Sequence, residues 1–328
     1  MRQFEYVRAT DAASAVQAHR AANAAFLAGG TTLLDLMKLD VMRPQEVVDV
    51  NDLATPFGDV HANAEGLHLG AFAHMADVAD NPDVKRDYPM IAQALMLAAS
   101  AQIRNMATLG GNVLQRTRCS YFRDVSWTQC NKRNPGSGCA ALAGNNRKHA
   151  VLGTSENCIA TYAGDFAQAL VALDADVEII GPGGPRPIRF EELHVVPGST
   201  PNIETTLQPG DLITGFFVPA SAMAKRSLYL KVRDRESYEF ALASAAVGLD
   251  MNGNSVNEAR IALGGVATKP WRAHEAEVAL KGQALDESSA RATADAAFAG
   301  AVAHGDNQYK IELGKRTLVR ALLQVAEA

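Results

Sequence analysis

Cysteine is absent from most of this chain: all four cysteines of its 328 residues lie within one 40-residue stretch. So few cysteines in so long a chain exclude a small secreted disulfide scaffold. Long apolar runs are absent as well, because the most apolar stretch, residues 240–249, is too short to span a bilayer. The N-terminus lacks the apolar segment of a secretory signal peptide. We therefore expect a soluble protein without an export signal of its own.

The overall composition is that of an ordinary globular protein. Hydrophobic residues make up 48% of the chain, charged residues 20%, and the formal net charge is -5. This balance gives no reason to expect nucleic acid or an anionic membrane as a partner. The length predicts two or three domains, each with enough residues for a core of its own.

The cysteine-bearing stretch is strongly basic. Residues 116–149 contain seven Arg and Lys side chains but only one acid, Asp124. Positive surroundings favour deprotonated thiolates and a bound cluster of net negative charge. Gaps of ten, eight and eighteen residues between the cysteines suit a cluster in a long loop better than the tight pairs of a zinc site. An iron–sulfur centre is favoured, and zinc, a pair of disulfides and free thiols remain alternatives. The candidate ligands are Cys119, Cys130, Cys139 and Cys158.

The order of predicted elements changes along the chain. The first sixty residues read as βαβαβ, with strands at 4–7, 25–28 and 47–50 and helices at 12–24 and 33–39. This order predicts a small parallel layer with a glycine turn at the carboxyl end of a strand. Residues 115–160 lack apolar periodicity and indicate a long functional loop. From about residue 220, strands followed by two closing helices predict an α+β domain.

Two glycine loops could bind phosphate groups. They are FLAGGTTL at residues 26–33 and IRNMATLGGN at residues 103–112. Paired glycines let backbone N–H groups approach a ligand closely, and a helix N-terminus favours negative charge. Each loop alone is more typical of an ordinary turn, and neither is the G-x-G-x-x-G of a nicotinamide-binding site. Two such loops about eighty residues apart could clamp a pyrophosphate from both sides.

These motifs resemble a known family. AGGTTLLDLMK followed by IRNMATLGGN is similar to the FAD-binding subunit of the xanthine dehydrogenase family of molybdenum hydroxylases. The four-cysteine segment after GGN resembles flavin subunits that also carry a [4Fe-4S] cluster. These are the subunits of periplasmic aldehyde oxidoreductases and, more distantly, of 4-hydroxybenzoyl-CoA reductases. The runs QRTRC, CNKR, PGSGCAAL, KVRDR and ALGGVA are closest to the aldehyde oxidoreductase type, and the resemblance covers essentially the whole chain.

The resemblance implies an α+β protein with a particular domain order. A two-part FAD-binding fold of the vanillyl-alcohol oxidase type would carry a [4Fe-4S] loop insertion and precede an α+β flavoprotein C-terminal domain. We expect boundaries at 1–58, 59–220 with the insertion at about 115–160, and 221–328. The four cysteines would be the cluster ligands. The implied FAD-binding residues are Leu27, Ala28, Gly29, Gly30, Thr31, Thr32, Leu33, Thr108, Gly110, Gly111, Asn112, Asp165, Leu212 and Lys231.

The chain departs from the family pattern at two places. Thr32 stands where relatives commonly have Asp or Asn, so we expect one polar contact to FAD to differ. Ala98 and Ala99 stand where some members place an aromatic residue beside the flavin. Tyr162 and Tyr238 are alternatives for that stacking position, although each is also typical of an ordinary core or surface tyrosine.

The resemblance also implies a function without a catalytic acid or base on this chain. A molybdenum-cofactor large subunit would oxidise an aldehyde, and a small [2Fe-2S] subunit would pass electrons to FAD and on to an external acceptor. The alternatives are a 4-hydroxybenzoyl-CoA reductase-like flavin subunit, a stand-alone flavin oxidase, and a metal-stabilised interaction module that binds nucleic acid. We expect neither nucleic acid nor membrane as partners. The complex would be periplasmic by co-export with a signal-bearing partner, or cytoplasmic.

Overall fold

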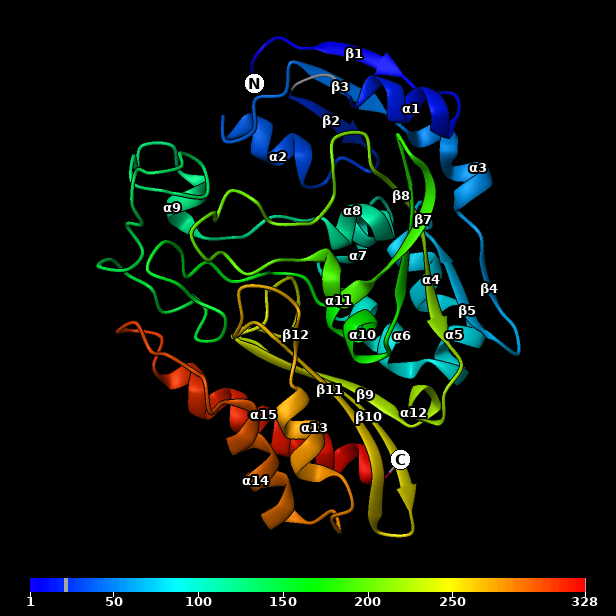
Figure 1. The fold of residues 1–328 in the computed structure, drawn as a ribbon, viewed down its shortest axis with the longest axis vertical. Coiled ribbons are helices and arrows are strands. Elements are labelled where there is room, and N and C mark those ends of the chain that lie inside the picture. The colour runs from blue at the N-terminus through cyan, green and yellow to red at the C-terminus, as the bar shows by residue number, and fades with distance from the viewer. Residues whose placement is uncertain (21–22, 328) are drawn as a thin grey trace.

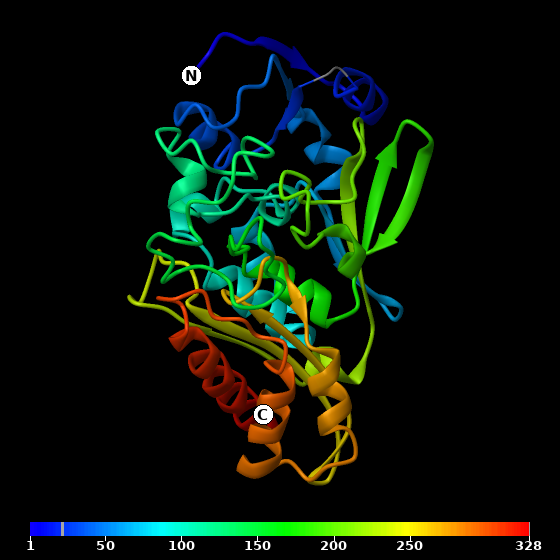
Figure 2. The same cartoon turned by 60° about the vertical axis from the view of Figure 1, so that its left-hand side comes forward.

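The computed structural model describes residues 1–20 and 23–327, and its three sheets are stacked in tiers (Figures 1 and 2). The first tier has the strand order β1-β3-β2, and both pairs are parallel. The predicted βαβαβ order is therefore confirmed. Its elements are β1 (Glu5–Arg8), α1 (Ala12–Ala18), β2 (Ala24–Leu27), α2 (Leu33–Lys38) and β3 (Glu46–Asp49).

Helix α1 is shorter than the predicted 12–24. The sequence offers Thr10 or Asp11 as its N-cap, and the structure shows Asp11, whose side chain accepts from the Ser14 N–H at 2.7 Å while the Ser14 hydroxyl completes a capping box. It ends at Ala18. Residues 21 and 22 of the predicted helix lie outside the described residues.

The middle tier is a five-stranded sheet in the order β4-β5-β8-β6-β7, with every neighbouring pair antiparallel. The apolar runs at 67–69 and 177–180 predict two further short strands, and the structure confirms them as β5 and β6. The central strand β8 was not predicted, because Gly215 and Pro219 interrupt its apolar run. The strands are β4 (Val60–Ala62), β5 (Gly66–Gly70), β6 (Asp176–Gly181), β7 (Gly184–Arg189) and β8 (Leu212–Pro219).

Helices fill the space between the middle sheet and the third sheet. The Ala-, Leu- and Met-rich run at 90–101 predicts a helix, which the structure shows as α6 (Pro89–Met96); it stops early and is followed by Ala99 in a left-handed conformation with φ 48°. Helix α10 (Phe166–Ala172) is buried along its whole length. No helix in the described part of the chain combines the length and apolarity needed to cross a bilayer. The remaining helical elements of the first two tiers are η1 (Asn51–Leu53), α3 (Ala54–Phe57), α4 (Met75–Asp80), α5 (Pro82–Asp87), α7 (Ala101–Arg104), α8 (Leu109–Val113) and α11 (Phe190–Leu193).

The third tier confirms the predicted order of strands followed by helices. Its antiparallel sheet has the order β12-β11-β10-β9, and three helices cover one face (Figure 2). In the last helix, Leu318, Leu322 and Val325 recur at helical spacing and are fully buried. The elements are α12 (Ala222–Lys225), β9 (Ser227–Val232), β10 (Ala243–Asn252), β11 (Ser255–Gly264), β12 (Trp271–Arg272), α13 (His274–Leu280), α14 (Glu287–Ala297) and α15 (Tyr309–Ala326).

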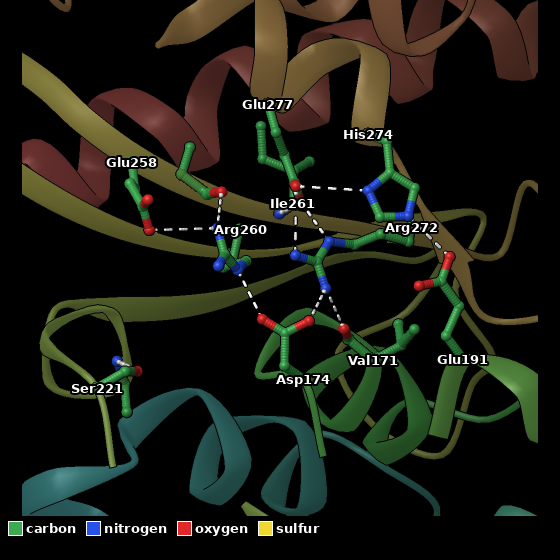
Figure 3. Close-up of polar contacts among 12 residues, drawn as sticks. Val171, Asp174, Glu191, Ser221, Glu258, Arg260, Ile261, Arg272, His274 and Glu277 are labelled. Atoms are coloured by element: carbon green, nitrogen blue, oxygen red, sulfur yellow. Dashed lines mark hydrogen bonds and ion pairs between the residues drawn. The ribbon is translucent and has the colours of Figure 1, made fainter. Parts of the chain in front are cut away.

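A network of ion pairs fastens the third tier to the second (Figure 3). Asp174, just after α10, accepts from the guanidinium groups of Arg260 at 2.7 Å and Arg272 at 3.0 Å. Arg272 also donates to the Val171 carbonyl oxygen at 2.6 Å and pairs with Glu277. Burial would raise the pKa of Asp174, but the two guanidinium groups outweigh it and hold that pKa below its usual value. The carboxylate therefore stays charged at neutral pH.

Residues 115–160, the cysteine segment, contain little regular structure, as predicted. Helix α9 (Ser120–Arg123) is four residues long, and the rest is turns and isolated bridges. The segment lies at one side of the molecule, between α2 and the start of α15 (Figure 1). Its apolar residues form two small clusters, one joining Leu36, Phe122 and Cys130 and the other Tyr121, Ala141 and Ile159, and near its end Val151 and Leu152 join the core of the C-terminal domain.

Candidate functional site

The two glycine loops touch each other. A Cβ atom at Gly29 would stand 1.9 Å from the Met106 carbonyl oxygen, so only glycine fits there. Gly30 has φ 70°, a conformation that glycine adopts without strain. Loops about eighty residues apart in sequence therefore form one surface.

A cavity of about 840 Å³ opens over this surface, in the upper range of volumes for small-molecule sites. It lies between the first and second tiers, with residues of both contributing to its walls. Ten of the fourteen predicted FAD-binding residues line it: Ala28, Gly29, Gly30, Thr31, Thr32, Leu33, Thr108, Gly110, Gly111 and Leu212. The tertiary structure thus brings most of the predicted residues to one cavity.

The first loop supplies free hydrogen-bond donors. Among the described residues, the backbone N–H groups of residues 29–32 have no protein acceptor. The second loop differs, because the Gly110 N–H donates to the Ala71 carbonyl at 2.8 Å and the Gly111 N–H to the Thr108 hydroxyl at 3.3 Å. The first loop can therefore bind an anion through its backbone N–H groups. The second loop, whose N–H groups are already bonded, forms a neighbouring wall of the cavity. These features fit a diphosphate-containing cofactor such as FAD.

Four predicted FAD-binding residues do not line the cavity. Leu27 ends β2, and Asn112 lies in α8 with a buried side-chain oxygen that has no partner among the described residues. Lys231 and Asp165 form an ion pair of 2.8 Å whose side chains are 1% and 4% exposed. Burial raises the pKa of Asp165, and the Lys231 ammonium and the hydroxyl of Tyr229, at 2.6 Å, oppose that rise.

The two candidate stacking tyrosines also lie elsewhere. Tyr162 is buried, and its hydroxyl donates to the Val113 carbonyl at 2.9 Å. Tyr238 is 56% exposed. The largest group of cavity residues that the sequence did not indicate comes from the segment before β8, where no glycine motif marks them: Asn202, Glu204, Thr205, Leu207, Gln208, Pro209 and Asp211.

The four cysteines are free thiols, and all of them line one small cavity of about 10 Å³. The disulfide alternative is therefore wrong. Cys130 and Cys139 face each other across an isolated bridge. Burial raises the pKa of Cys119 to about 12 and that of Cys158 to about 11. No group of three or more Cys, His, Asp or Glu side chains in the described chain is arranged to hold a metal ion.

The basic side chains of the cysteine segment do not form a free basic surface. Six of the seven pair with carboxylates outside the segment, and Arg133 donates to the carbonyls of Tyr121 and Phe122 within it. These ion pairs attach the segment to the rest of the protein. Because the basic side chains are already paired, the structure does not support the alternative in which the segment binds nucleic acid. The six pairs are Arg116–Glu204, Arg118–Asp35, Arg123–Asp35, Lys132–Glu204, Arg147–Asp234 and Lys148–Glu239.

One of these carboxylates connects the two cavities. Glu204 accepts from Arg116 at 3.1 Å and from Lys132 at 2.8 Å. Arg116 and Glu204 line the large cavity, whereas Lys132 lines the cysteine cavity beside Cys158. The attraction of Lys132 also opposes the rise in the Cys158 pKa. The two candidate sites are therefore adjacent and share a charged wall.

The family follows from comparison with known proteins. Residues 2–221 match the model of the FAD binding domain in molybdopterin dehydrogenase, and residues 228–325 match the CO dehydrogenase flavoprotein C-terminal domain. The chain therefore belongs to the FAD-binding medium subunits of the molybdenum hydroxylase family, has their two-domain FAD-binding fold, and is an oxidoreductase subunit.

Individual relatives cover nearly the full length. The FAD-binding subunit PaoB of an aldehyde oxidoreductase from Escherichia coli is 46% identical, over 99% of this chain and 98% of its own. The glyceraldehyde dehydrogenase medium chain of Sulfolobus acidocaldarius is 27% identical, over 87% of this chain and 83% of its own. The solved carbon monoxide dehydrogenase of Hydrogenophaga pseudoflava superimposes with a TM-score of 0.77 at 26% identity, covering 99% of this chain and 98% of that one.

Proposed function

We propose that this chain is the FAD- and [4Fe-4S]-containing electron-transfer subunit of a molybdenum hydroxylase that oxidises aldehydes. The observation that carries the proposal is the pairing of the two cavities. A cavity large enough for FAD and a cavity lined by all four cysteines share the Arg116–Glu204–Lys132 wall. The similarity to an aldehyde oxidoreductase subunit over nearly the whole chain supports the same assignment.

The FAD pyrophosphate and ribityl chain would lie against residues 28–33 and 108–111. The free backbone N–H groups at 29–32 support this, because they can donate to phosphate oxygens. Asp165 and Lys231 lie outside this cavity and pair with each other between α6, α10 and β9, so their contact with FAD stays a prediction. FAD supplies the redox chemistry, and the chain binds and orients it. We assign no catalytic acid or base here.

The donor set of the second cavity fits an iron–sulfur cluster. Four cysteines with no disulfide partner are gathered in a segment that has no core of its own, and a cluster would tie it down at four points. As free thiols, Cys119 and Cys158 are protonated at neutral pH, and loading has to displace their protons.

Substrate oxidation would take place on a molybdenum-cofactor large subunit. A [2Fe-2S] small subunit would deliver electrons to FAD, and an external acceptor would remove them. The complex would reside in the periplasm after co-export with a signal-bearing partner, or in the cytoplasm.

Cofactor analysis of the purified protein tests the proposal. We expect flavin absorption bands with a broad iron–sulfur shoulder, and iron and acid-labile sulfide in equal amounts. Cys158→Ser should remove the shoulder and keep the flavin bands, whereas Ser126→Ala, in an exposed turn of the same segment, should keep both. Flavin without iron would support a stand-alone flavin oxidase, zinc without flavin an interaction module, and a colourless protein would overturn the proposal.

A further inference from the structure

His149 lies against one of the candidate cluster ligands. Its Nε2 atom is 3.1 Å from the Cys119 sulfur. The residue is only 5% exposed, and its ring packs near that of Tyr121 with 6.1 Å between centroids. A polar ring is thus buried beside a cysteine in the interior of the cysteine segment.

The hydrogen bonds of this ring assign its proton. The Nδ1 atom of His149 is buried and makes no hydrogen bond of good geometry in the described part of the chain, although the Asn146 backbone lies near the ring. A buried N–H without an acceptor is costly, so a ring proton is placed where an acceptor exists. That atom is Nε2, and the acceptor is the sulfur of Cys119. The contact is therefore an N–H···S hydrogen bond in which the imidazole donates.

The C-terminal domain fixes the backbone that carries this ring. Lys310, which is 1% exposed, donates from Nζ to the carbonyl oxygens of His149 at 3.3 Å and Gly265 at 2.5 Å. Asn307 donates to the Ala150 carbonyl at 2.9 Å. Both donors come from α15 or the turn before it, so the position of His149 depends on a domain that supplies no cysteine.

We infer that His149 donates a hydrogen bond to the Cys119 thiolate of the [4Fe-4S] cluster and raises the reduction potential of that cluster. The inference rests on the proposed cluster. One-electron reduction adds a negative charge to the cluster, and a donor to a ligand sulfur stabilises the more negative form more strongly. His149 acts on the cluster through Cys119 and is therefore a positioning residue. Lys310 and Asn307 fix its backbone by donating to the carbonyls of His149 and Ala150.

A redox titration of the purified complex, followed by the electron paramagnetic resonance signal of the reduced cluster, tests this role. His149→Phe keeps a ring of similar size without a donor, and His149→Gln keeps an N–H donor. We expect His149→Phe to lower the ratio of reduced to oxidised cluster at a fixed potential about tenfold. For a one-electron couple this corresponds to a reduction potential lower by about 59 mV. His149→Gln should recover most of that change.

His304→Phe is the matched control. Its Nε2 contacts the Thr154 hydroxyl at 3.0 Å, in the cysteine segment but on no cysteine, so the potential should stay unchanged. Loss of iron from His149→Phe but not from His149→Gln would also support the hydrogen bond. Three results would overturn this inference and leave the proposed function standing. They are an unchanged potential in His149→Phe, equal shifts of the potential in both variants, and loss of iron from both variants. A wild-type protein without iron would overturn the proposed function as well.

Discussion

The Lys231 ammonium lies 2.8 Å from the Asp165 carboxylate, and both side chains are almost completely buried. The Lys231 ammonium also donates to the Leu97 carbonyl at 3.0 Å, so the C-terminal domain is joined here to the ends of α6 and α10. A pair with this geometry is strongly interdependent, because removing one partner leaves the other charge uncompensated in the interior.

We therefore expect Lys231→Met to lower the free energy of unfolding by roughly 3–5 kcal/mol. The double variant Lys231→Met/Asp165→Asn should recover much of that loss, since it removes both charges and keeps an acceptor for Tyr229. Urea denaturation of the three proteins measures this. Retention of FAD by the double variant would show that the pair is structural, and loss of FAD would favour the predicted contact with the flavin.

The close approach of the glycine loops predicts an effect at position 29. Gly29→Ala places a methyl group against the Met106 carbonyl and forces the loops apart. We expect at least about tenfold weaker FAD binding, or about 1.4 kcal/mol, measured by titration of the apoprotein. Gly300→Ala is the control, because a Cβ there meets no atom within 4 Å. Equal affinity in the two variants would contradict the placement of FAD.

The Asp174 network predicts that domain docking weakens in acid. The guanidinium groups of Arg260 and Arg272 hold the pKa of Asp174 below its unfolded value. The stabilisation from these ion pairs is thus fully present above about pH 4, and it is lost as the pH falls through the pKa of Asp174 in the folded protein. Asp174→Asn should lower the free energy of unfolding by roughly 2 kcal/mol at pH 7, with a smaller difference near pH 3. The exposed Asp295→Asn should change little at either pH.

A buried histidine predicts a second pH dependence, in a different window. Burial lowers the pKa of His194 to about 4, and its Nε2 contacts the Val113 carbonyl at 3.1 Å. Between about pH 6.5 and 4 the unfolded chain binds a proton that the folded chain does not, so acid favours unfolding. His194→Gln should reduce the slope of unfolding free energy against pH in this window. Over the whole window, the pH-dependent change in unfolding free energy due to His194 amounts to up to about 3 kcal/mol. An identical slope in the wild-type protein and the variant would contradict this prediction.

The sequence identified the parts of the site that depend on backbone chemistry. Gly29 and Gly30 mark a turn that only glycine can make, and the four cysteines carry their chemistry in their residue type. It also indicated the βαβαβ layer and the order of the C-terminal domain, because apolar periodicity is a local property. It missed β8, whose glycine and proline look like a turn until neighbouring strands pair with it on both sides.

The sequence by itself determined which residue types the protein has for chemistry: two glycine loops, one clustered set of cysteines and a basic segment. Only the tertiary structure decided how the charges are used. The basic residues pair with acids distant in sequence, such as Asp35 and Glu204, and Lys231 is occupied by Asp165. Pairing depends on which surfaces meet after folding, and long-range contacts leave no periodic signal in the chain. The same packing buries His149 beside Cys119 under a domain that begins about seventy residues later.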